Sequence, residues 1–195
     1  MMRSPYEWDW VQTGIFGVIM FAAQSLMPFV VLAFGAVAKE IPVKESVKPL
    51  KNFEFIDHAF ILHNKFVTIL FLYHIDCFIW TSSNVSWKAS ELTFQNTVLA
   101  YIALYAIYDF FYTLFHRLLH VRGLYKYVHK HHHRQMVPFR GTPDAINVHP
   151  FEFTTGEYLH LFCLYWVPTH IYTILLFVIS DGIFASLNHT RFCFK

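Results

Sequence analysis

The chain has 195 residues, of which 55% are hydrophobic and only 14% are charged, and its formal net charge is +2. A water-soluble domain of this size cannot bury so much apolar surface, so the composition excludes an ordinary soluble protein and predicts an integral membrane protein. The small net charge gives no indication of nucleic-acid binding. Three widely spaced cysteines fit neither a disulfide framework nor a zinc-finger spacing.

Residues 1–94 are predicted to form an N-terminal membrane-anchoring region with two spans. The first apolar segment covers about residues 14–38, more than the roughly 20 residues that a helix needs to cross a bilayer, and Pro28 is expected to kink it. The second covers about residues 59–80. Its polar residues indicate either that one side faces protein rather than lipid or that the span starts later; they are His63, Asn64, Lys65, His74 and Asp76.

Residues 95–195 are predicted to form the second region of the chain. Its first apolar segment, about residues 94–119, is amphipathic and carries His116 and His120 at its end. The next, about residues 158–187, is interrupted at Pro168 and is either a helical hairpin or one kinked helix. The fold class predicted from these segments is an all-α bundle of about four transmembrane helices or hairpins.

Basic residues predict how the bundle is oriented. Between residues 110 and 143 the chain has six Lys or Arg and no Asp or Glu, so the positive-inside rule places this stretch in the cytoplasm. The loop after the first span, which includes Lys44 and Glu45, carries four lysines and is assigned to the same side. Two membrane crossings separate the two loops, so the assignments agree.

The basic stretch holds two histidine motifs, H-x-x-x-H at residues 116–120 and H-x-x-H-H at residues 129–133. Residues three or four apart lie on one helical face, so each motif gathers its imidazoles while His131 faces away. Clustered imidazoles are typical of transition-metal sites, although a solvated basic stretch is the alternative. The predicted metal ligands are His116, His120, His129, His132, His133 and His189.

Two of the candidate residues have simpler explanations. His189, in an Asn-His-Thr sequence after the last apolar segment, is a sixth imidazole or merely a helix cap. Asp109 lies seven residues before His116 and is a candidate carboxylate partner for a metal-bound imidazole. The alternative for Asp109 is a pairing with a lysine or tyrosine of another span.

The sequences YDFFYTLFHRLLH, LYKYVHKHHHR and NVHPFEFTTGE between residues 108 and 157, with LNHT near residue 189, resemble the fatty acid hydroxylase/sterol desaturase superfamily. The closest resemblance is to its C4-methylsterol oxidase-like members, over residues 95–190. The resemblance implies a multi-pass endoplasmic reticulum enzyme with a cytosolic, histidine-ligated di-iron centre. Such enzymes hydroxylate or desaturate sterols or fatty acyl lipids with dioxygen, and a b-type cytochrome and its reductase supply electrons.

The resemblance leaves alternatives for function and metal. Iron is the expected metal and zinc a possible substitute, since imidazole binds both. The family's final H-x-x-H-H box is not among the 195 residues, so we expect these residues alone to bind metal weakly and to oxidise little lipid. The alternative functions are a catalytically inactive relative and a membrane protein that binds or transports metal.

Overall fold

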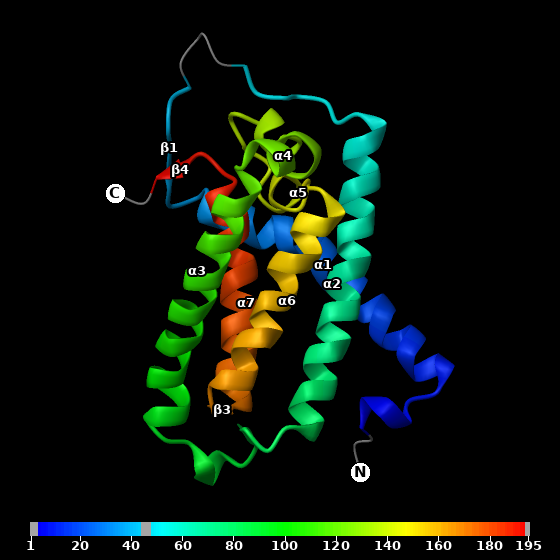
Figure 1. The fold of residues 1–195 in the computed structure, drawn as a ribbon, viewed down its shortest axis with the longest axis vertical. Helices are drawn as coiled ribbons and strands as arrows, with labels where there is room; N and C mark the ends of the chain where they lie inside the picture. Colours follow the sequence, from blue (N-terminus) through cyan, green and yellow to red (C-terminus); the bar gives the residue numbers. More distant parts are fainter. Residues whose placement is uncertain (1–3, 44–47, 194–195) are drawn as a thin grey trace.

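The structure, a computed structural model, describes residues 4–43 and 48–193. The long helices after the first run roughly along one direction and alternate in polarity, whereas the first long helix, in blue, crosses them obliquely (Figure 1). Among the described residues, four helical segments are long and apolar enough to cross a membrane. These features confirm an all-α membrane protein. The long helices are α1 (Trp10–Phe34), α2 (Phe55–Thr81), α3 (Ala100–Leu119), α6 (Pro150–Trp166) and α7 (Ile171–Asn188).

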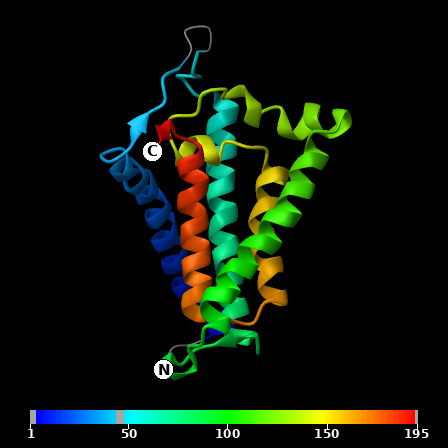
Figure 2. The ribbon, with the colours of Figure 1, turned by 90° about the vertical axis from the view of Figure 1, so that its left-hand side faces the viewer.

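The helices are arranged as a single bundle (Figure 2). Helix α1 contacts α2 and α7, α6 contacts both α2 and α3, and α3 also contacts α7. Residues 1–94 and 95–195 therefore build the same bundle. Short helices and two-residue strands connect the long ones; they are Pro5–Glu7, Ala89–Glu91, Gln95–Leu99, α4 (Arg122–Leu124), Tyr125–His129, His132–Arg134, α5 (Thr142–Ala145), β1 (Lys39–Glu40), β2 (Val85–Ser86), β3 (Thr169–His170) and β4 (Phe192–Cys193).

The last apolar segment is a helical hairpin. Its first helix, α6, begins at Pro150, eight residues before the predicted start, because Pro fits the first helical position and His149 caps the helix by accepting a hydrogen bond from the Phe151 amide. The chain turns at residues 167–170, where β3 pairs in parallel with β2. At the other end of the bundle, β1 pairs antiparallel with β4.

Helix α1 begins at Trp10 rather than near residue 14, because the Asp9 carboxylate accepts a hydrogen bond from the Gln12 amide in a capping box. Pro28 lies inside this helix, which continues to Phe34. In α2, the buried Asn64 donates hydrogen bonds to two carbonyl oxygens of the segment before α6, at 2.8 and 2.9 Å. This contact confirms that polar residues of the second segment face protein.

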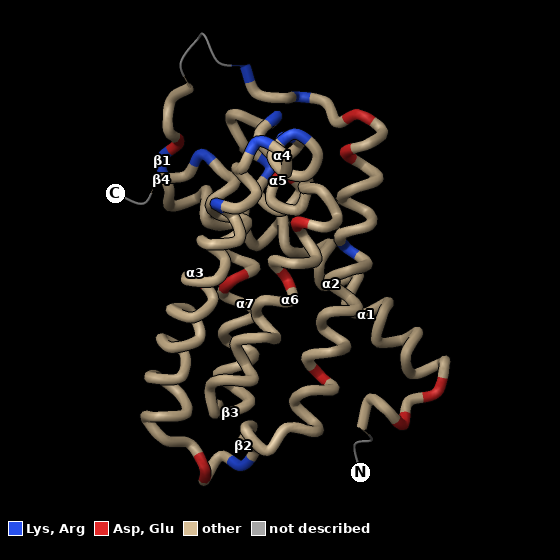
Figure 3. The backbone as a smooth tube through the Cα atoms, in the orientation of Figure 1, with Lys and Arg blue, Asp and Glu red and all other residues tan. Residues whose placement is uncertain are grey.

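The two ends of the bundle differ in charge. We call the end at which α3 finishes and α6 begins the histidine end; it is uppermost in Figure 3. Most described Lys and Arg residues lie there (Figure 3), whereas Lys88 lies at the opposite end, where its carbonyl oxygen is 3.1 Å from His170 of β3. Lys44 and Glu45 of the predicted charged loop lie outside the described residues.

Candidate metal centre

Four of the predicted ligands meet at the histidine end. One ring nitrogen from each of His116, His120, His129 and His133 lies within 4.8 Å of the others, and we call these four residues the histidine cluster. The Nε2 atoms of His116 and His120 are 3.3 Å apart, and those of His129 and His133 are 2.9 Å apart. Each pair comes from one of the two sequence motifs.

Local chain geometry brings the two motifs together. Helix α3 presents His116 and His120 one turn apart, and it ends where Val121 becomes extended, just before the helix-disfavouring Gly123. The chain then folds back through a π-helical turn at residues 125–129 and a 3-10 turn at residues 132–134. Helical segments with π geometry often occur at functional sites. Here the turn places His129 against the end of α3.

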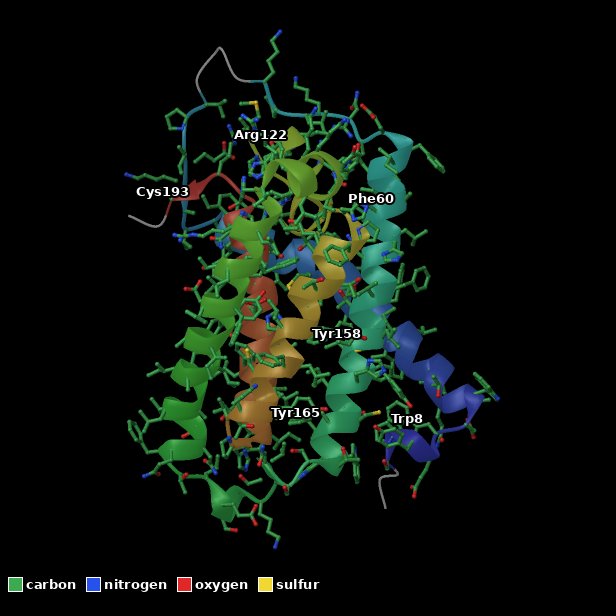
Figure 4. The ribbon with its side chains drawn as sticks, in the orientation of Figure 1. Trp8, Phe60, Arg122, Tyr158, Tyr165 and Cys193 are labelled. Atoms are coloured by element: carbon green, nitrogen blue, oxygen red, sulfur yellow. The ribbon has the colours of Figure 1, made fainter. Side chains whose placement is uncertain are left out.

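A buried carboxylate holds the returning segment against α2. Asp57, fully buried in the first turn of α2, lies 2.9 Å from His131 Nε2 and accepts a 2.9 Å hydrogen bond from Asn147. Arg134 extends the network to Glu54, with an ion pair of 2.6 Å. His131 therefore faces away from the cluster, as predicted, and its ring contacts Phe60, which Figure 4 labels on α2.

A second buried carboxylate orients the innermost imidazole. Glu152, in the first turn of α6, lies 2.8 Å from Nδ1 of His129, and both side chains are buried. A carboxylate that accepts a hydrogen bond from one ring nitrogen fixes the tautomer, so the other nitrogen presents its lone pair. With Glu152 ionised, Nε2 of His129, 2.9 Å from Nε2 of His133, is free to serve as a ligand atom.

The environment keeps the imidazoles neutral. Burial, followed by the neighbouring imidazoles, lowers the pKa of His129 to about 4, and burial together with His189 lowers the pKa of His132 to about 3. The pKa of His133 is lowered for the same reason, chiefly by burial. Neutral imidazole is the form that binds a metal ion, so these lowered pKa values keep His129, His132 and His133 in the binding form at pH 7.

The donor set fits one transition-metal ion. Bonds of about 2.1 Å to a shared ion place neighbouring donor nitrogens about 3.0–3.4 Å apart, close to the separations within the two histidine pairs. Nδ1 of His116 is buried and has no hydrogen-bond partner, so no hydrogen bond to the protein gives this nitrogen a structural role. His120 and His133 are exposed, which leaves the cluster accessible.

The other two predicted ligands form a separate pair. The rings of His132 and His189 have centroids 5.3 Å apart, and Nδ1 of His132 is buried without a hydrogen-bond partner. Nδ1 of His189 donates to the Ala185 carbonyl at 2.7 Å, which holds its ring beside the end of α7. The pair adjoins the cluster, since the His129 and His132 centroids are 5.7 Å apart. It offers two imidazoles to a second ion.

Asp109 does not join this arrangement. Its side chain is exposed on α3, and it forms no hydrogen bond or ion pair with the residues that the structure describes. Seven residues are almost two helical turns, so Asp109 lies on the same side of α3 as His116 but about 10 Å away along the helix axis. The carboxylate that contacts an imidazole is Glu152 instead. The sequence held a signal for it, an acidic residue three positions after His149.

Aromatic rings line the cluster on both sides. The Tyr125 ring stacks on His120 with centroids 5.7 Å apart. On α3, Tyr112 lies 5.8 Å from His116 and stacks on Tyr108 at 5.5 Å. These tyrosines lie toward the bundle interior, and they separate the cluster from a second polar region described below.

Comparison of the chain with models of protein families, with curated proteins and with solved structures gives no match. The superfamily resemblance therefore rests on the histidine motifs and the residues around them.

Proposed function

We propose that this protein is a membrane-bound non-haem iron oxidoreductase that uses dioxygen to hydroxylate or otherwise oxidise a sterol or fatty acyl lipid. The observation that carries the proposal is the histidine cluster itself, four converging imidazole nitrogens at one end of an apolar helix bundle. Imidazole-rich sites bind iron and also zinc, so zinc is the expected substitute in purified protein. A bound iron centre supplies dioxygen activation, which no side chain of the cluster provides.

The residues of the chain have distinct tasks in this proposal. His116, His120, His129 and His133 would hold one ion, and the adjoining His132–His189 pair would take part in holding a second. Glu152 fixes the tautomer of His129. Asp57 holds the second motif in register with the first by retaining His131. This buried support leaves the ligand rings little freedom to rotate.

The position of the site supports a membrane lipid as the substrate. The helix that supplies His116 and His120 is a candidate membrane span with exposed apolar side chains, including Leu114 and Leu118. A lipid acyl chain or sterol would reach the cluster laterally along such a surface. Because the histidine end is rich in Lys and Arg, the proposal places it in the cytosol, in an endoplasmic reticulum membrane, with electrons from a b-type cytochrome and its reductase.

Metal content tests the proposal directly. Protein reconstituted in lipid nanodiscs and loaded with Fe(II) should retain iron after desalting, and the double variant His116→Ala/His120→Ala should retain at most about a tenth as much, because two ligands are lost together. The matched control is His131→Gln, which removes an imidazole from the same H-K-H-H-H stretch but keeps a donor beside Asp57. Equal iron in the double variant and the control would exclude the cluster as the metal site.

A second candidate function is metal binding or transport without oxidation, and the exposure of His120 and His133 favours it. Oxygen and lipid chemistry distinguish the two. A lipid oxidoreductase with iron and reductant should consume dioxygen in proportion to hydroxylated or oxidised lipid, measured by an oxygen electrode and mass spectrometry. Iron flux into sealed proteoliposomes, with no lipid product, would favour the transporter.

A further inference from the structure

A second polar region lies inside the bundle, away from the histidine cluster. Helices α1, α2 and α7 enclose a cavity of about 540 Å³, with α6 contributing part of its wall; we call it the membrane pocket. Its volume lies within the roughly 300–1,000 Å³ of small-molecule sites. Leu175 and Ile179 line it and are about half exposed, at 47% and 55%, so it opens on the outer face of α7.

Apolar side chains make most of the pocket wall, and a small set of polar groups interrupts them. On α6, Glu157 accepts a 3.1 Å hydrogen bond from Thr68 of α2. His160, also on α6 and 7% exposed at its side chain, places Nε2 2.9 Å from a carboxylate oxygen of Asp181 on α7. Polar side chains from α2, α6 and α7 thus face the same pocket. They can orient a polar group of a ligand, which an apolar wall alone cannot do.

Acidic side chains outnumber basic ones among the polar residues that line the pocket. Asp76 of α2 also lines it and forms no hydrogen bond or ion pair with the described residues. Three carboxylates therefore share the pocket with one imidazole, and no described Lys or Arg lines it. Carboxylates that outnumber the basic groups around them are costly within a membrane bundle and mark functional sites by default. A cationic guest would offset that cost.

We propose that the membrane pocket binds a single-chain amphiphile with a cationic, hydrogen-bond-donating head, of which a long-chain primary amine is the simplest example. The ammonium group would lie between Glu157 and Asp181, and the chain would follow the apolar wall formed by Phe16, Met20 and Ile75. Ionised carboxylates only accept hydrogen bonds, so a donor head matches them. A fatty acid would add a fourth negative charge and is disfavoured.

This pocket is distinct from the histidine cluster, and the proposed amine binding does not depend on the proposed oxidoreductase activity. The His160 ring lies 4.0 Å from Tyr108, which stacks on Tyr112, which in turn lies 5.8 Å from His116. Two tyrosine rings therefore separate the two sites. Metal ligands can be removed without altering a residue that lines the pocket.

Competition binding in nanodiscs of zwitterionic lipid tests the pocket. A fluorescent alkylamine probe should be displaced by octadecylamine with a Kd at least about tenfold below that of octadecanol or octadecanoic acid, because only the amine pairs with the carboxylates. The variant Glu157→Gln/Asp181→Asn should lose that preference. The matched control is Asp109→Asn, a carboxylate of the same bundle that lies outside the pocket, and it should keep the preference.

A second variant guards against misfolding of the carboxylate variant. Gly182 lines the pocket, and a Cβ there would meet only Met27, at 3.9 Å. Gly182→Leu raises helix propensity and fills the cavity, so it should weaken probe binding at least about tenfold while every carboxylate remains. Equal affinity for amine, alcohol and acid, or full binding by Gly182→Leu, would overturn the proposal. So would displacement of the amine by millimolar sodium, which would identify a small-cation site.

Discussion

The histidine cluster and the membrane pocket both gather ionisable side chains in an apolar bundle, but their chemistry is opposite. The cluster has four imidazoles whose lone pairs converge, with one supporting carboxylate at His129. The pocket has three carboxylates and a single imidazole, His160. Imidazole nitrogen donors at short separation suit a transition-metal ion, whereas dispersed carboxylates in an apolar wall suit an organic cation.

The two regions also differ in how the chain builds them. The cluster comes from residues 116–133, so short helical turns place its ligands. The pocket joins Thr68, Glu157 and Asp181, which come from three helices and meet only through tertiary packing. We therefore expect changes to the ligands within residues 116–133 to affect metal binding and leave amine binding intact, and changes to Glu157 and Asp181 to do the reverse.

The largest effect is expected from a comparison of variants at two adjacent histidines. His133→Ala removes a ligand of the cluster and should lower metal affinity by more than the roughly 10–100-fold that outer hydrogen-bond partners contribute. His132→Ala, its matched control, removes the partner of His189 but none of the four imidazoles of the cluster, and it should leave the first ion bound. Metal titration of both variants measures the difference. Equal losses would mean that the motif acts as one ligand set.

Next in size is the loss of the buried support on α2. Asp57→Ala leaves His131, Asn147 and Arg134 without their shared acceptor, and it should lower the free energy of unfolding by about 3 kcal/mol. Denaturant unfolding in detergent measures this, and amine binding by the folded fraction should not change. An effect below about 0.5 kcal/mol would show that the segment is held by packing alone.

A smaller effect is expected at the carboxylate beside the cluster. Glu152→Gln removes the charge that faces Nδ1 of His129 but keeps a hydrogen-bonding side chain of similar shape. Metal affinity should fall about 10–100-fold, because the imidazole loses basicity and its fixed tautomer. The same titration of Glu157→Gln, five residues along α6, serves as the control and should show no loss.

The sequence predicted the cluster far better than the pocket, for a physical reason. Helical periodicity alone joins His116 to His120 and His129 to His133, so four predicted ligands were found together. Periodicity does not indicate which side of a helix packs inward. Asp109 shares a helical face with His116 but lies about two turns away along α3, whereas Glu152 reaches His129 only because α6 packs beside the returning segment.

The membrane-spanning helices were predictable from properties of single segments, whereas the pocket depends on how several helices pack together. Length and hydropathy define each span by itself, whereas the meeting of Thr68, Glu157 and Asp181 depends on how three helices pack. Ionisable residues within apolar segments were the only available signal, and they do not identify their partners. The start of α6 also differs from the prediction, because the cap at His149 starts the helix in a stretch that lacks strong hydropathy.

The smallest effect is expected at Asp109, which belongs neither to the histidine cluster nor to the membrane pocket. This carboxylate is exposed on α3 without a hydrogen bond or ion pair to the described residues. Asp109→Asn should therefore change the free energy of unfolding by less than about 0.5 kcal/mol. It should also leave both the iron content and the amine preference unchanged. A fall in iron content would mean that Asp109 supports the metal-bound protein through a contact that this structure does not contain, and the carboxylate beside the cluster would then not be Glu152 alone.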